Sequence, residues 1–124
     1  SNPTGTLISH EALTAVHEEI VRRRGTLIVD EIYHGLTYGR DPRTALEISD
    51  DIIVLNSFSK YFGMTGWRVG WIVAPPALVE PIGRLAQNLY LAVSTPAQYA
   101  ALASFSDENI AIREARRQTR RERR

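Results

Sequence analysis

Blocks of hydrophobic and polar residues along the chain predict alternating helices and strands. Residues 9–25 begin with Ser9, a residue type that caps helix N-termini, and carry apolar side chains at helical spacing before a closing glycine. The apolar run 26–29 follows directly and is typical of a strand buried on both faces. Two further apolar runs, 52–55 and 68–74, predict two more strands.

The second half of the chain has a helical pattern. Apolar residues at helical spacing follow Pro76, Pro96 starts a shorter helix, and Asp107 opens the last one. Strands that alternate with helices indicate an α/β fold, in which helices pack against a sheet. Ligands of such folds bind beyond the carboxyl ends of the strands, so these ends are where we expect a functional site.

Composition narrows the class of protein. The 124 residues are 44% hydrophobic and 23% charged and carry a formal net charge of +1, which is typical of one soluble globular unit. The absence of cysteine excludes disulfides, thiolate metal sites and cysteine nucleophiles, and it suits a cytoplasmic protein. No stretch reaches the roughly 20 apolar residues that a membrane-spanning helix needs.

We expect the chain to be a fragment of a longer protein. The single methionine is Met64, so Ser1 does not stand for a start codon. The arginine-rich run 113–124 continues a helical pattern without a glycine or proline stop.

The chain contains fourteen arginines and a single lysine, Lys60. A guanidinium stays protonated and forms no imine under physiological conditions, whereas a primary amine does so once its pKa is lowered. Lys60 is therefore either a leftover of a general bias toward arginine or an amine retained for its chemistry, and composition alone leaves both interpretations open.

Polar residues gather where the predicted strands end. A carboxylate at the end of a buried strand, Asp30, needs a cationic partner. Lys60 lies among serines and aromatic residues, an environment that makes an amine nucleophilic. Arg68, with Ser57 and Ser59, offers a fork of donors and two hydroxyls suited to a phosphate. The sequence thus predicts a buried carboxylate, an amine and an anion clamp at one edge of the sheet, and it predicts no metal site.

In order and spacing, four motifs resemble the class I/II aminotransferases, which are pyridoxal 5'-phosphate (PLP) enzymes of the aspartate aminotransferase fold, also called fold type I. An Asn-Pro-x-Gly turn at residues 2–5 precedes an Asp-x-x-Tyr motif at 30–33, and Ser-x-x-Lys at 57–60 precedes an arginine eight positions later. The resemblance covers nearly the whole chain and implies a mostly parallel sheet flanked by helices. Four motifs in register are far more specific than any one of them.

The resemblance implies a role for each matching residue. Lys60 would hold the cofactor aldehyde as a Schiff base and, once displaced, move the proton between substrate and cofactor. Asp30 would face the pyridine nitrogen and keep it protonated, so that the ring acts as an electron sink. The other cofactor-binding residues would be Tyr33 and Asn2, at the phenolic oxygen, and Ser57, Ser59 and Arg68, at the phosphate.

The resemblance also implies how the chain is organised. Residues 1–105 would form the C-terminal half of the PLP-binding large domain, and residues 106–124 would start a helix toward a small domain. The substrates would be an amino acid and a 2-oxo acid, and the intact enzyme would be a homodimer. With half an active site, the fragment alone would be inactive.

Two alternatives remain at this stage. A PLP-dependent β-eliminating lyase of the same fold shares every motif seen here. A non-enzymatic nucleic-acid binder would use residues 113–124, where seven arginines stand against two glutamates. Since the net charge is only +1, we expect these arginines to be the solvated face of a helix instead, with neither nucleic acid nor membrane as a partner.

Overall fold

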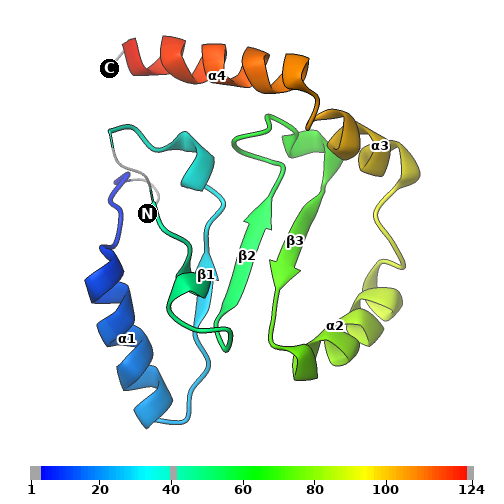
Figure 1. Cartoon of the computed structure of the whole chain (residues 1–124). Coiled ribbons are helices and arrows are strands. Elements are labelled where there is room, and N and C mark those ends of the chain that lie inside the picture. Colours follow the sequence, from blue (N-terminus) through cyan, green and yellow to red (C-terminus); the bar gives the residue numbers. More distant parts are fainter. Residues whose placement is uncertain (1–3, 40–41, 123–124) are drawn as a thin grey trace.

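The computed structural model describes residues 4–39 and 42–122, which fold as a small sheet with helices around it (Figure 1). Short 3-10 turns occupy the long connections. In chain order the elements are α1 (His10–Arg22), β1 (Ile28–Asp30), η1 (His34–Leu36), η2 (Ala45–Glu47), β2 (Ile53–Ser57), η3 (Thr65–Trp67), β3 (Gly70–Val73), α2 (Pro76–Leu89), α3 (Thr95–Ala103) and α4 (Asp107–Glu122).

The sheet has the strand order β1-β2-β3. Strands β1 and β2 are parallel, with Asp30 opposite Leu55, whereas β2 and β3 are antiparallel, with Ser57 opposite Gly70. The α/β class predicted from sequence is confirmed, and among the described strands the sheet is mixed. The carboxyl ends of β1 and β2 meet at one edge, as parallel neighbours must.

Helix α1 forms as its sequence predicts. Ser9 Oγ accepts a hydrogen bond from the backbone N–H of Ala12 at 3.1 Å, and Glu11 lies in the first turn, where the helix dipole favours a carboxylate. The helix lies beside β1 (Figure 1), and its Leu13 packs on the first hydrophobic cluster. That cluster has Ala45, Ile52 and Val54 at its centre.

A second cluster supports the segment that follows β2. Phe58, Met64 and Ala101 are its buried members. The rings of Phe58 and Phe62 lie 4.5 Å apart, and the Trp71 ring lies 5.3 Å from Phe58 in an edge-to-face arrangement. These aromatic contacts fix the turn between β2 and η3, which carries Lys60, against β3.

Two strand predictions need correction. The first strand is Ile28–Asp30 rather than 26–29, and it is not buried on both faces, because Ile28 is 57% exposed. Within the described chain β1 is an edge strand, with a neighbouring strand on the β2 side alone. The third strand starts at Gly70 rather than Arg68, because Arg68 ends η3 in a left-handed backbone with φ 55°, outside the extended region of a regular strand.

Candidate functional site

Lys60 lies in a tight turn directly after β2. The backbone N–H of Met64 donates to the carbonyl of Phe58 at 3.0 Å, and the N–H of Gly63 donates to that of Lys60 at 3.1 Å, so the turn closes on itself. The half-buried Lys60 side chain places Nζ 5.7 Å from the centre of the Tyr33 ring, a cation–π distance. Among the described residues, no hydrogen bond or ion pair engages its amine.

Asp30 and Tyr33 come from the carboxyl end of the neighbouring strand β1. The backbone N–H of Glu31 continues the pairing to Leu55 at 2.9 Å, which fixes this end of β1 next to β2. One oxygen of Asp30 accepts a hydrogen bond from the backbone N–H of Ile32 at 3.0 Å. No described side chain provides the cationic partner expected for Asp30, whose carboxylate is exposed, so that expectation stays a prediction.

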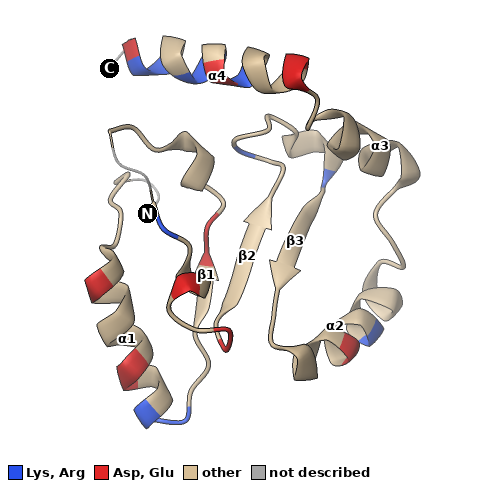
Figure 2. Cartoon of the chain, in the orientation of Figure 1, with Lys and Arg blue, Asp and Glu red and all other residues tan. Residues whose placement is uncertain are grey.

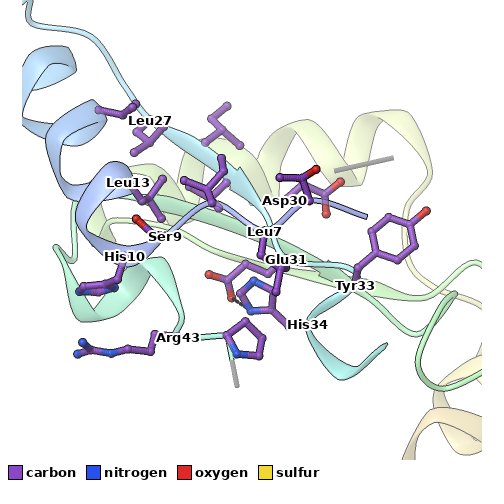
Figure 3. Close-up of a pocket in the computed structure, with 16 residues that line it drawn as sticks. Leu7, Ser9, His10, Leu13, Leu27, Asp30, Glu31, Tyr33, His34 and Arg43 are labelled. Atoms are coloured by element: carbon purple, nitrogen blue, oxygen red, sulfur yellow. Dashed lines mark ion pairs between the residues drawn. The ribbon is translucent and has the colours of Figure 1, made fainter. Parts of the chain in front are cut away.

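Asp30 and Tyr33 both line a cavity of about 490 Å³ between α1 and β1. In the close-up (Figure 3), Tyr33 lies at one end, His10 and Arg43 at the other, and Glu31 with His34 between them. Because Lys60 Nζ is near the Tyr33 ring, the amine approaches the Tyr33 end of this cavity.

The proposed phosphate ligands lie on the β3 side of Lys60. Ser57 Oγ donates to the carbonyl of Val69 at 2.9 Å and lies 2.9 Å from Ser59 Oγ. It also accepts from the backbone N–H of Ser59 at 3.0 Å. The hydroxyl of Thr65 donates to the carbonyl of Ser59 at 2.7 Å, and Arg68 Nη1 donates to the carbonyl of Thr65 at 3.1 Å.

These bonds join Ser57, Ser59 and Arg68 into one connected segment around the turn. The guanidinium of Arg68 makes no described contact with either serine hydroxyl. It lines a second hollow, of about 890 Å³, between β3 and α2. Asn2, expected at the phenolic oxygen, lies outside the described residues.

Glu31 is a residue whose importance the sequence interpretation missed. It is only 5% exposed, and its Oε1 accepts hydrogen bonds from the backbone N–H of Ala45 at 2.7 Å and the hydroxyl of Thr44 at 3.0 Å. This carboxylate caps η2 and ties the connection between β1 and β2 to the end of β1. The one available signal was the acidic pair at positions 30 and 31, since neighbours in a strand point to opposite faces.

Tyr61, next to the lysine, is a second residue that the sequence interpretation missed. Its hydroxyl donates to Glu114 Oε1 at 2.5 Å, a contact across 53 positions that no local pattern reveals. Burial, and then the bond to Glu114, raise the pKa of the Tyr61 phenol above its usual value. The phenol is thus held in the form that can donate.

The comparisons with known proteins identify the family. A family model described as aminotransferase class I and II matches residues 1–124. A valine–pyruvate aminotransferase of Mycobacterium tuberculosis is 41% identical over 110 residues, which are 87% of this chain and 28% of that protein. An aspartate aminotransferase of Thermotoga maritima is 32% identical over 112 residues, 88% of this chain and 30% of that protein.

Solved structures agree. A crystal structure of an aminotransferase from Mycobacterium tuberculosis matches 94% of this chain and 33% of its own, with a TM-score of 0.87 and 38% identity. Aspartate aminotransferase from Thermus thermophilus with maleate matches 99% of this chain and 33% of its own, with a TM-score of 0.90 and 28% identity. The chain belongs to the class I and II aminotransferase family and spans about a third of these relatives, which confirms the resemblance seen in the sequence.

The arginine-rich helix gives no support to nucleic-acid binding. Acidic and basic residues are both spread along α4 (Figure 2). Arg117 pairs with Glu114 at 2.8 Å. Arg113 is buried, which corrects the expectation that these arginines form a solvated face. Within the described residues, no helix is long and apolar enough to cross a bilayer.

Proposed function

We propose that this chain supplies the reactive lysine and part of the cofactor site of a PLP-dependent aminotransferase, which transfers an amino group between an amino acid and a 2-oxo acid. The observation that carries the proposal is the position of Lys60. The single lysine of this 124-residue chain has its amine over the Tyr33 ring, beside the strand end that carries Asp30.

The described residues fit PLP group by group. The Lys60 amine, unengaged by any described residue, suits the aldehyde. Asp30 has one oxygen without a described partner, which suits a protonated ring nitrogen. The Ser59 hydroxyl and the remaining donors of Arg68 suit the phosphate, and Ser57 would join them by turning its hydroxyl away from the carbonyl of Val69. Asn2 stays a proposed ligand on the resemblance alone.

PLP, when bound, supplies an electron sink for charge that develops at the substrate Cα. The chain's own residues would do the rest. Nζ of Lys60 would take the proton from Cα and return it to the cofactor side, since it is the amine nearest the Tyr33 end of the cavity. The Asp30 carboxylate would keep the ring nitrogen protonated, and the Tyr33 hydroxyl would donate to the ring's phenolic oxygen.

The organisation of the whole protein belongs to the same proposal. Residues 1–105 would be the C-terminal half of the large domain, and α4 would lead toward the small domain. Cytoplasmic location and assembly as a homodimer are expected with it. No observation favours a β-eliminating lyase, which would expel a leaving group from Cβ of its amino acid and release ammonia with a 2-oxo acid such as pyruvate.

The test uses the full-length protein mixed with PLP. Wild type should show the visible absorption band of lysine-bound PLP, and Lys60→Ala should lose it together with turnover. Arg84→Ala on α2, which removes an exposed cation, is the control and should keep both. A band that survives in Lys60→Ala would contradict the assignment, and ammonia with pyruvate in place of the donor's 2-oxo acid would favour the lyase.

A further inference from the structure

The turn that carries Lys60 is fastened on both sides of the lysine. On one side, Ser59 is bonded through its N–H to Ser57 and through its carbonyl to Thr65, which ties it to the sheet. On the other side, the Tyr61 hydroxyl is bonded to Glu114 in the middle of α4. The lysine backbone therefore lies between an anchor on β2 and an anchor on a distant helix.

The Tyr61 ring is held as firmly as its hydroxyl. A Cβ added at Gly35 would overlap the Tyr61 side chain, so η1 packs directly against it. The Phe62 ring lies edge-to-face at 5.1 Å. Since Gly35 is two positions from Tyr33, Tyr61 also fixes the lysine turn relative to the segment that carries the Tyr33 ring.

Arg113 completes the attachment from α4. Its guanidinium carbon lies 5.3 Å from the centre of the Tyr61 ring and 4.9 Å from that of Phe62. The side chain is only 9% exposed, and its Nε has no hydrogen-bond partner among the described residues. Burying an unpaired donor costs free energy, and the contacts of the charge with the two rings offset part of it.

Glu114 is itself fixed by neighbours. Arg117 donates to its Oε2 from Nε at 2.8 Å, and its Nη1 donates to the carbonyl of Thr37 at 3.5 Å. The Glu114 carboxylate, which accepts the hydrogen bond from Tyr61, is thus oriented by Arg117. Arg117 also contacts the segment that follows η1. A fixed acceptor positions its donor better than a free one does.

We propose that Tyr61, Arg113 and Glu114 are positioning residues for Lys60: α4 holds the lysine turn through them and sets where the amine meets the cofactor aldehyde. The inference rests on the proposed function of Lys60. If α4 holds the turn in this way, a displacement of α4 moves Tyr61 and, with it, the adjoining Lys60. A substrate-driven movement of the part of the protein attached to α4 would then reach the amine without any contact between substrate and Tyr61.

The experiment uses the full-length protein. Tyr61→Phe removes the hydroxyl and keeps the packed ring, and Glu114→Ala removes the acceptor, whereas Glu114→Gln keeps an acceptor oxygen. Glu122→Ala, which changes an exposed carboxylate of the same helix, is the matched control. Two quantities are measured for each variant: the dissociation constant of PLP, and the rate at which borohydride traps PLP on the Lys60 peptide, read by mass spectrometry. Thermal unfolding of each variant is recorded alongside.

Tyr61→Phe and Glu114→Ala should each raise the PLP dissociation constant and slow trapping by about threefold to tenfold, as expected for a lost positioning contact rather than a lost ligand. Glu114→Gln should stay close to wild type. The inference is overturned if both variants match Glu122→Ala in trapping and PLP affinity, even where their unfolding temperature falls. A wild type that traps no PLP on Lys60 would instead remove the proposed function on which the inference rests.

Discussion

Asp30 and Glu31 are adjacent carboxylates with opposite surroundings. Asp30 is exposed and has one backbone hydrogen bond, whereas Glu31 is buried and accepts from Thr44 and Ala45. The alternation of side chains at a strand end separates them. One carboxylate is left available to a ligand, and the other holds the connection between β1 and β2 in place.

Glu31→Ala should lower the free energy of unfolding by about 1–3 kcal/mol, because it leaves the backbone N–H of Ala45 buried without its acceptor. Glu31→Gln should lose less, since its amide oxygen can still accept. Urea unfolding of the full-length protein measures both. Glu18→Ala, an exposed carboxylate on α1, is the control and should change little; equal losses in Glu31→Ala and Glu18→Ala would contradict the structural role.

At the residue scale, sequence predicted the kinds of side chains at the strand ends and not their partners. The hydroxyls, the amine and the arginine were recognisable because they follow apolar runs at motif spacing. No described side chain is the cation expected for Asp30, and the burial of its strand was overestimated because it was inferred from an apolar run alone. The bond between Tyr61 and Glu114 depends on how α4 crosses the fold, which no local pattern encodes.

Helices were predicted better than strands, for a physical reason. The start of a helix is set by local sequence, by caps such as Ser9 and by prolines such as Pro76. Helices α1 and α2 therefore begin where expected. Strand ends depend on the neighbouring strand. The antiparallel pairing of β3 and its start at Gly70 follow from contacts with β2 that lie outside the strand's own sequence.

Alanine substitutions at Gly70, in strand β3, and at Gly83, in helix α2, should have opposite effects on stability. A Cβ at Gly70 would lie 2.7 Å from the backbone oxygen of Asn56, so Gly70→Ala should force β3 away from β2 and destabilise the protein by about 1–3 kcal/mol. Gly83 lies inside α2 with open space around it, so Gly83→Ala should stabilise by roughly 0.5–1 kcal/mol.

Chemical denaturation of both variants in the full-length protein checks the signs. Gly83→Ala serves as the control for the added methyl group itself. A neutral Gly70→Ala would show that the strands can separate at no cost. A destabilising Gly83→Ala would show that this position of α2 is packed in the full-length protein.

At the scale of the whole molecule, the described chain exposes much apolar surface. Leu89 is 71% exposed, Leu91 81%, Tyr99 70% and Leu102 69%. Every residue of β3 is exposed as well. Sequence predicted that these segments are apolar and could not say what covers them, since the relatives that the chain matches are about three times as long.

A polypeptide of these 124 residues alone should therefore bind a hydrophobic dye such as ANS and self-associate, because extensive exposed apolar surface promotes association. Dye fluorescence and sedimentation velocity measure the two effects. The full-length protein is the comparison and should bind far less dye per molecule. A monomeric 124-residue chain without dye binding would contradict the expectation that other segments cover this surface.

The left-handed backbone of Arg68 sets two requirements against each other. A bulky residue with φ 55° stores about 1–2 kcal/mol that glycine in its place would release. Yet glycine has no guanidinium with which to grip a phosphate. If Arg68 binds the phosphate as proposed, thermal robustness and cofactor retention favour different residues at this position, and the arginine there would mean that retention took precedence.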